Sequence, residues 1–205
     1  MITIIDYGIG NLNSIKNMLK HIGTDALISN KIVDIENAEK LVLPGVGSFD
    51  YGMEQLKQSG LIETLNKIVL QKRTPILGIC LGVQLMTESS EEGKSKGLGW
   101  INGKTIPFDK SKLTPNHKIP HMGWTDVYGF EKSKLFTDMY DEPRFYFVHS
   151  YHLHIKNPAK VLVKAKYGYE FAAGIEYDNI VGVQFHPEKS HKFGMKLLDN
   201  FVKYY

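Results

Sequence analysis

The chain has 205 residues, of which 42% are hydrophobic and 23% charged, and its formal net charge is +3. These values are those of an ordinary globular domain with a sizeable core, and a weak, scattered positive charge does not favour nucleic acid or a membrane surface as a partner. The apolar runs are far shorter than the roughly 20 residues of a membrane span, and the N-terminus lacks the basic region and cleavage signal of secreted proteins. We therefore expect a cytoplasmic protein.

The first half of the chain alternates short apolar runs with helical patterns. Strands are predicted at residues 2–5, 26–29, 40–43 and 75–79. Helices are predicted at residues 11–22, 61–72 and 81–89. Strands that alternate with helices in this way indicate βαβ units with right-handed crossovers, and hence an α/β fold with a mostly parallel, doubly wound sheet.

The second half has a different pattern from Gly97 onward, with several alternating apolar segments. Further strands are predicted at residues 100–107, 124–127, 144–153, 159–166, 172–177 and 180–185. Residues 110–118 are polar and predict a loop, and residues 194–205 predict a closing helix. This half is expected to add antiparallel strands to the sheet edge or to form a small flanking sheet. Because no segment resembles a linker, residues 1–205 are expected to form a single domain.

Cys80 is the only cysteine, so the chain has no internal disulfide. It follows a buried strand and precedes a helical segment, and Gly78 and Gly82 flank it two positions away on each side. This is the strand–turn–helix context of a nucleophile elbow, in which the following helix favours the thiolate. An inert thiol that packs like a small hydrophobic residue is the alternative. The glycine spacing favours the nucleophile.

A candidate base for such a nucleophile is His186, which follows the predicted strand at residues 180–185. Sites in open α/β sheets lie outside the carboxyl ends of the strands. Glu188 lies two residues further on, beyond the rigid Pro187, and can orient one imidazole nitrogen while the other faces the thiol. A surface turn is the alternative interpretation, which the presence of Cys80 disfavours.

The segment at residues 44–47 is a glycine-bearing loop between a strand and a helix. Its free backbone N–H groups could hold a developing oxyanion together with the amide of Leu81. No Lys-Ser/Thr pair follows, which excludes a P-loop. The glycines at residues 8 and 10 are too few for a dinucleotide fingerprint and predict a tight turn.

Three histidines lie close together in the second half. On one continuous strand His152 and His154 would share a face, with His149 on the other. Neither a cysteine nor a matched carboxylate lies nearby, so we predict no metal site. His121 is either a satisfied structural histidine or a residue that faces a partner. Tryptophan more often anchors a core or an interface than a cofactor, which applies to both Trp100 and Trp124.

Two motifs resemble the signatures of class I (triad) glutamine amidotransferases: Gly78-Ile79-Cys80-Leu81-Gly82-Val83-Gln84 and His186-Pro187-Glu188. Finer details resemble the glutaminase subunit of imidazole glycerol phosphate synthase. They lie at residues 6–12, 44–49, 97–100, 121–124, 147–151 and 182–190. The likeness runs over nearly the whole chain.

The resemblance implies a flavodoxin-like fold and a glutaminase with a catalytic triad of Cys80, His186 and Glu188, without a cofactor. The Gly45-Val46 peptide and Leu81 would form the oxyanion hole. L-glutamine would be held by Gly47, Gln84, His149, Ser150 and Tyr151. The ammonia would pass to a (β/α)₈ cyclase in a heterodimer that makes imidazole glycerol phosphate in histidine biosynthesis. The surface that faces this partner would include Asn11, His121 and Trp124.

Two positions depart from the family pattern: Thr125 stands where the family usually has asparagine, and Val83 replaces a common methionine. Both leave the triad untouched. They keep open a paralogous glutaminase that feeds a different synthase, for example one that forms amidino groups on surface sugars. A non-catalytic regulatory module and a cysteine hydrolase or peptidase of related fold are the remaining alternatives.

Overall fold

The computed structural model describes residues 1–130 and 133–205. Its strands are β1 (Ile2–Ile5), β2 (Ala26–Ser29), β3 (Lys40–Leu43), β4 (Ile76–Ile79), β5 (Thr87–Ser90), β6 (Ile101–Pro107), β7 (His121–Tyr128), β8 (Arg144–His149), β9 (Tyr151–Ile155), β10 (Val161–Tyr167), β11 (Tyr169–Tyr177) and β12 (Ile180–Val183). Its α-helices are α1 (Leu12–His21), α2 (Ile32–Glu36), α3 (Phe49–Gln58), α4 (Ile62–Asn66), α5 (Leu81–Leu85) and α6 (His191–Tyr204).

The described strands join into one sheet with a main order of β2-β1-β3-β4-β12-β11-β10-β7-β8. The first five strands of this order are parallel to one another, and antiparallel pairing begins where β11 meets β12. A side branch of β5, β6 and β9 joins the sheet at β11. The predicted α/β fold, mostly parallel in its first half and antiparallel in its second, is confirmed.

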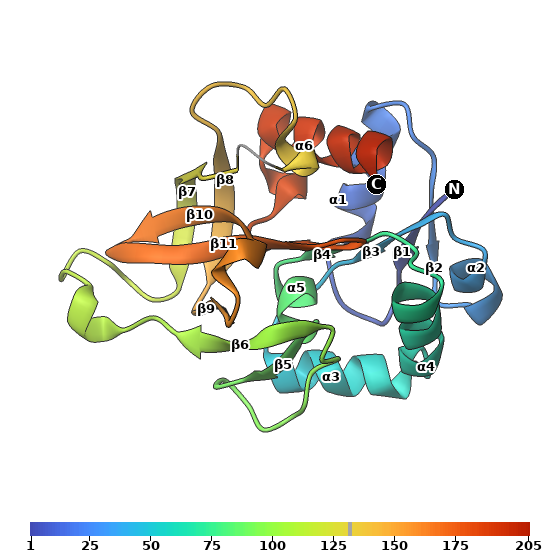
Figure 1. Cartoon of the computed structure of the whole chain (residues 1–205), viewed down its shortest axis with the longest axis horizontal. Coiled ribbons are helices and arrows are strands. Elements are labelled where there is room, and N and C mark those ends of the chain that lie inside the picture. The colour runs from blue at the N-terminus through green and yellow to red at the C-terminus, as the bar shows by residue number, and fades with distance from the viewer. Residues whose placement is uncertain (131–132) are drawn as a thin grey trace.

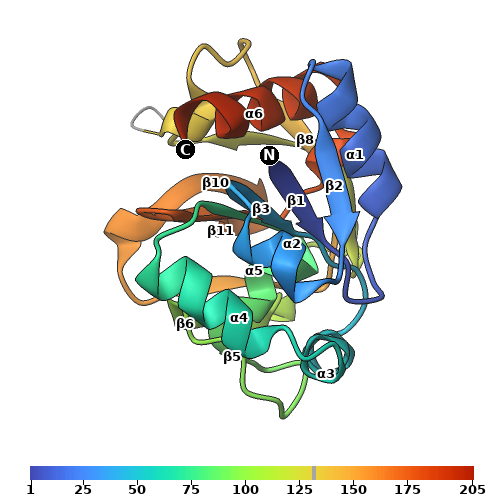
Figure 2. The ribbon, with the colours of Figure 1, turned by 90° about the vertical axis from the view of Figure 1, so that its right-hand side faces the viewer.

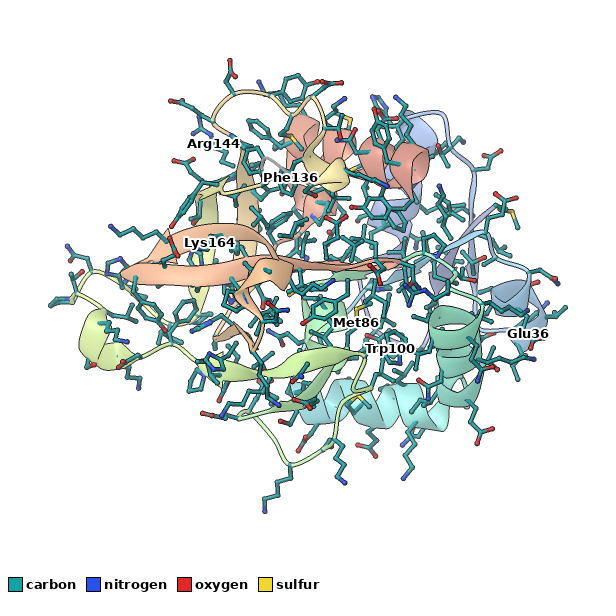
Figure 3. All side chains as sticks on the ribbon, viewed as in Figure 1. Glu36, Met86, Trp100, Phe136, Arg144 and Lys164 are labelled. Atoms are coloured by element: carbon teal, nitrogen blue, oxygen red, sulfur yellow. The ribbon has the colours of Figure 1, made fainter. Side chains whose placement is uncertain are left out.

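Helices cover both faces of the parallel part, as Figures 1 and 2 show. On one face lie α1 and α6, whose buried side chains, such as Leu19 and Phe201, join one hydrophobic core. On the other face lie α3, α4 and α5, whose buried side chains join a second core. Figure 3 shows Phe136 on the α6 side of the sheet and Met86 and Trp100 on the opposite side.

The central strands are buried on both faces because helices cover both. Every residue of β1, β4 and β12 is buried, which explains why these strands appear in the sequence as continuous apolar runs rather than as alternating patterns. In the pairing of β4 with β12, Gly78 lies opposite Gly182 and Ile79 opposite Val183. This register sets the relative positions of the residues that follow the two strands.

The predicted helix at residues 81–89 is wrong beyond Leu85. The hydroxyl of Thr87 donates a hydrogen bond to the carbonyl of Gln84 at 2.7 Å, and the chain then pairs as β5 with β6. The helix at residues 61–72 is confirmed in position, but its second half, Lys67–Gln71, is a π-helical turn. The short helix α2 has no counterpart in the sequence prediction.

The predicted strand at residues 144–153 is two strands, because the chain bends at Ser150. The first part, β8, pairs with β7, while the second part, β9, turns away to pair with β6 and β11. Among residues 1–130 and 133–205, we find no helix that is both long enough and apolar enough to cross a membrane.

Candidate active site

Three segments that the sequence singled out meet at one edge of the sheet. The loop at residues 44–47 follows β3, Cys80 follows β4, and His186 lies three residues beyond the end of β12. These strands are neighbours and parallel, so their carboxyl ends lie side by side. The parallel topology therefore brings together residues that are about one hundred positions apart in the sequence.

Cys80 lies on a strained turn between β4 and α5. Its φ of 54° and ψ of −111° are rarely adopted by residues other than glycine, and its amide donates to the carbonyl of Val183 at 2.9 Å. The turn also requires Gly82, because a Cβ atom there would lie 1.8 Å from the carbonyl oxygen of Leu43. The backbone thus presents the thiol at the sheet edge, with Cys80 only 6% exposed.

His186 is held through both its backbone and its ring. Its amide donates to the carbonyl of Tyr146 at 2.9 Å, and its carbonyl accepts from the hydroxyl of Ser190 at 2.6 Å. Nδ1 of the ring lies 2.8 Å from Oε1 of Glu188, which also accepts from Nδ2 of Asn11 at 2.8 Å. The ring orientation is therefore fixed by a carboxylate that is itself held in place.

The protonation states of His186 and Glu188 depend on each other. Burial by itself lowers the pKa of His186, but the hydrogen bonds and negative charges of Cys80 and Glu188 outweigh it and raise the pKa to about 10. Burial by itself raises the pKa of Glu188, but hydrogen bonds from His186 and Asn11 lower it overall. The arrangement favours a protonated imidazole between two acidic groups, which is the state that can give a proton to a leaving group.

The loop after β3 is anchored on its inner side and open on its outer side. The hydroxyl of Tyr7 donates to the carbonyl of Pro44 at 2.6 Å. A Cβ atom on Gly45 would lie 2.8 Å from Cβ of Leu81, so only glycine allows the loop to approach the turn after Cys80 this closely. Val46 and Gly47 are exposed, and Gly47 has a φ of 105°. Burial, and then the nearby Cys80, raise the pKa of Tyr7.

A cavity of about 390 Å³ opens at this edge, a suitable size for a small polar molecule. Its lining includes nine predicted site residues: Val46, Gly47, Cys80, Leu81, Gln84, His149, Ser150, Tyr151 and His186. The structure adds four residues to which the sequence analysis assigned no role: Glu92, Pro120, Val148 and Lys189. One of these is acidic and one is basic. Gly45 and Glu188 are not among the lining residues.

The far wall of the cavity comes from the antiparallel part of the sheet. Cys80 Sγ lies 3.8 Å from the carbonyl oxygen of Val148 on β8. The side-chain amide of Gln84 donates to the carbonyl of Tyr151 at 3.1 Å and to Oε1 of Gln184 at 3.0 Å. Sequence reasoning missed Gln184, although it stands in one of the quoted motifs, because a buried amide has no spacing signal of its own.

The three predicted partner-facing residues have different environments. Trp124 is 44% exposed and stacks on the ring of His191. Asn11 is half-buried against Glu188. The interpretation of His121 as a residue that faces a partner is wrong, because it is only 2% exposed. Its structural alternative holds: its ring stacks on Tyr167 and Phe147.

The expected separation of His149 and His152 onto opposite faces is also wrong. Because the strand bends at Ser150, both rings pack against Phe108, whereas His154 is exposed. Within the described part of the chain, no group of three histidine, cysteine or acidic residues is arranged to hold a metal ion.

Comparisons with known proteins show the fold and the family of the chain. Solved structures with the same fold include a glutamine amidotransferase (TM-score 0.75, 16% identity, covering 99% of this chain and 98% of that one) and PurLQS from Thermotoga maritima (TM-score 0.74, 18% identity, 99% and 97%).

Two sequence relatives are named imidazole glycerol phosphate synthase subunit HisH 2. The one from Methanococcus maripaludis is 57% identical and the one from Pseudomonas aeruginosa 48%, each over 99% of both chains. The relative from Sulfurimonas denitrificans, named subunit HisH, is 46% identical over 100% of this chain and 98% of its own. The family model for class I glutamine amidotransferases matches residues 3–204, and the chain therefore belongs to that family.

Proposed function

We propose that this protein is a cytoplasmic glutaminase subunit that hydrolyses L-glutamine and delivers the ammonia to a synthase partner. The observation that carries the proposal is the placement of Cys80, His186 and the loop at residues 44–47 around one cavity at the carboxyl edge of the sheet. A nucleophile, a proton donor and backbone N–H groups are what acyl transfer from an amide requires.

In the proposed reaction the Cys80 thiolate attacks the side-chain amide carbon of glutamine. The oxyanion is held by the backbone amides of Val46 and Leu81, and the protonated His186 gives its proton to the departing ammonia. The resulting thioester is hydrolysed by a water molecule that His186 deprotonates. Glu188 keeps the imidazole in one orientation and stabilises its charged form.

The charges of the cavity suit the rest of the substrate. Free glutamine carries an ammonium group and a carboxylate at one end, and the lining offers one acidic side chain, Glu92, and one basic side chain, Lys189. Oε2 of Glu92 accepts from the backbone amide of Phe49 at 2.8 Å, which fixes the carboxylate. We assign the ammonium group to Glu92 and the carboxylate to Lys189. Gln84, Gly47 and residues 149–151 would hold the side chain of glutamine.

The proposed partner is a (β/α)₈ cyclase, and the proposed pathway is histidine biosynthesis. This proposal rests on the full-length relatives that are named as subunits of imidazole glycerol phosphate synthase. An exposed apolar pair on β7, Met122 at 61% and Trp124 at 44%, supports a docking surface on this side of the cavity. Asn11 is the further candidate for this surface.

A paralogous role is a second candidate. The relatives from Methanococcus maripaludis and Pseudomonas aeruginosa are both named subunit HisH 2, and the number in these names is what supports this candidate. A glutaminase of this kind could supply ammonia to a different synthase, such as one that forms amidino groups on sugars.

The largest predicted effect is that of Cys80→Ala in the complex with the synthase. Glutamine-dependent synthesis should fall by at least ~10³-fold, because the nucleophile is lost, while synthesis from added ammonium salts should persist. Glutamate release and product formation are to be measured for the cyclase partner and, separately, for a candidate sugar-modifying synthase.

The control is the wild-type complex with glutamine and with ammonium salts. Survival of glutamine-dependent synthesis in Cys80→Ala would overturn the assignment of the nucleophile. A wild-type chain that activates the sugar-modifying synthase but not the cyclase would replace the histidine pathway with the second candidate.

A further inference from the structure

The carbonyl oxygen of Tyr151, on the far wall of the cavity, accepts two hydrogen bonds. One comes from Nδ1 of His149 at 2.8 Å and the other from Nε2 of Gln84 at 3.1 Å. A carbonyl oxygen can only accept, so these contacts place a proton on Nδ1 of His149 and turn the NH₂ group of Gln84 toward Tyr151. From this point the polarity of two further branches can be worked out.

The first branch leads from His149 toward the protein surface. Burial, followed by the neighbouring His121, lowers the pKa of His149, so the ring is neutral and its Nε2 can only accept. The atom that faces it, Nδ1 of His121 at 3.0 Å, must therefore donate. The ring of His121 is neutral too, because burial and then His117 lower its pKa to about 4. Its Nε2 accepts from the hydroxyl of Thr125 at 2.8 Å.

The second branch leads from Gln84 to the nucleophile. Its NH₂ group also faces Oε1 of Gln184 at 3.0 Å, which leaves the NH₂ group of Gln184 to point toward Sγ of Cys80 at 3.9 Å. Gln184 is fully buried. The sulfur is therefore the acceptor, and a donor aimed at sulfur stabilises its negatively charged form.

Gly123 makes the surface branch possible. Residues four positions apart on a straight strand are separated by ~13 Å, too far for His121 and Thr125 to touch. Gly123 lies between them with a φ of 136°, a backbone conformation that favours glycine and departs from a straight strand, while the pairing of β7 with β8 continues unbroken through it. Thr125 is half-buried, and its neighbour Trp124 is exposed.

We propose that these side chains form one continuous hydrogen-bond chain in which each donor and acceptor is fixed, and that this chain positions the nucleophile. Its two branches meet at the Tyr151 carbonyl: Thr125 donates to His121, His121 to His149 and His149 to the carbonyl, while Gln84 donates to the carbonyl and to Gln184, which donates to the Cys80 sulfur. Gln184 is a positioning residue that keeps a donor on the sulfur, and Thr125 is the surface end of the chain. The proposal rests on the assignment of Cys80 as the nucleophile of the proposed glutaminase.

The arrangement connects the nucleophile to the strand that carries the exposed Met122 and Trp124. A ligand that moves β7 changes the contact between Thr125 and His121. Because none of the described donors can exchange roles with its acceptor, the geometry of each following hydrogen bond must adjust. The orientation of the Gln184 amide at the sulfur thereby depends on the position of a surface strand. This is a coupling through a continuous set of contacts rather than through distance alone.

The test uses the fact that Cys80 is the only cysteine of the chain. The rate of alkylation of the full-length protein by iodoacetamide then reports the reactivity of this thiol alone, without glutamine or a partner. The titratable groups that face the sulfur, His186 and Tyr7, stay unchanged in every variant. Rates are to be measured from pH 5 to pH 10, with circular dichroism as the check on folding.

Gln184→Met keeps the length of the side chain and removes the donor without adding a titratable group, so alkylation at pH 7 should slow by about tenfold. Gln184→Leu should do the same and serves as the second variant if Gln184→Met does not fold. Thr125→Val and His121→Phe should each slow alkylation about threefold, and neither should add to Gln184→Met. Thr125→Ser should restore the wild-type rate.

The matched control is Thr24→Val, at a half-buried threonine that precedes β2, which should leave the rate unchanged. An alkylation rate equal to that of wild type in the folded Gln184 variants would overturn the proposal. The proposal would also be overturned if the Gln184 variants were alkylated slowly but Thr125→Val and His121→Phe were both alkylated at the wild-type rate. If the wild-type complex fails to hydrolyse glutamine while alkylation responds as described, the proposed function is wrong and the hydrogen-bond chain stands.

Discussion

Two buried histidines have opposite pKa shifts: His186 lines the cavity, and His121 contacts His149 of the opposite wall. His186 and His121 are each 2% exposed, yet the pKa of one is raised to about 10 and that of the other lowered to about 4. Burial lowers both values. His186 lies between two acidic groups, whereas His121 has a hydroxyl and a neutral imidazole as hydrogen-bond partners. The partners, and not the burial, decide which wall carries a charge.

The comparison extends to the two walls themselves. The wall from the parallel strands places its reacting groups by backbone geometry, such as the strained turn at Cys80 and the glycines at residues 45 and 82. The wall from the antiparallel strands positions its groups by side-chain hydrogen bonds around His149. One wall is suited to chemistry with charged groups, and the other to holding a neutral framework.

The largest effect in this comparison is expected from Glu188→Gln, which makes the environment of His186 resemble that of His121. The glutamine-dependent kcat of the complex should fall by about 10³-fold, because the imidazolium loses its charged partner and its orientation. The pKa of His186 should fall as well, which NMR titration of the ring can follow.

The control for Glu188→Gln is synthesis from ammonium salts by the same complex, which should be unchanged. A glutamine-dependent kcat within about threefold of wild type would show that Glu188 does not orient the base.

The next effect concerns the pH dependence of stability. The folded pKa of His121 lies below its usual value of 6.5, so between pH 6.5 and pH 4 only the unfolded chain takes up this proton, and the unfolding free energy should fall by ~2–3 kcal/mol as the pH falls. For His186 the folded pKa is raised, so its contribution is present below pH 6.5 and is lost as the pH rises toward 10. Urea unfolding at a series of pH values measures both.

Two variants separate the acid limb and the alkaline limb of the curve of unfolding free energy against pH. His121→Phe should make the acid limb shallower, leaving the part that the buried His149 contributes, and should leave the alkaline limb unchanged. Cys80→Ala should make the alkaline limb shallower, leaving the part that Glu188 contributes, and should leave the acid limb unchanged. An acid limb that is identical in wild type and His121→Phe would contradict the buried neutral state of His121.

The smallest effect is expected from Asn11→Ala. Loss of the hydrogen bond to Oε1 of Glu188 should lower the glutamine-dependent kcat by about fivefold, because a single bond to a charged group is lost. Titration calorimetry with the partner measures the Kd separately, and an unchanged Kd would remove Asn11 from the proposed docking surface. A weaker Kd with an unchanged kcat would place Asn11 in the partner interface instead of the support of the base.

The sequence alone was sufficient for the parallel half of the fold. Strands at residues 2–5, 26–29 and 40–43 match the structure in both bounds, because each is a short, mainly apolar run that ends before a turn-forming residue, namely Asp6, Asn30 or Pro44. Residues 87–89 continue a helical pattern but form a strand, because their pairing with β6 is made by residues 14 or 15 positions away, which no local pattern contains.

For the candidate site, too, the sequence predicts residues within local motifs but not contacts between distant segments. Cys80 and His186 could be predicted, because each follows a buried strand within a local motif. Gln184 could not be given a role, since its contacts lie 100 and 104 positions away in sequence. The burial of His121 was equally hidden, because its neighbours Tyr167 and Phe147 come from other strands.

The pairing of β4 with β12 makes the thiol a reporter of folding. Cys80 meets His186 only when Gly78 lies opposite Gly182. A slip of one residue would turn every side chain of one strand to the other face of the sheet. During refolding from denaturant, the return of fast alkylation at the single cysteine therefore times the moment when this central parallel pair reaches its native alignment.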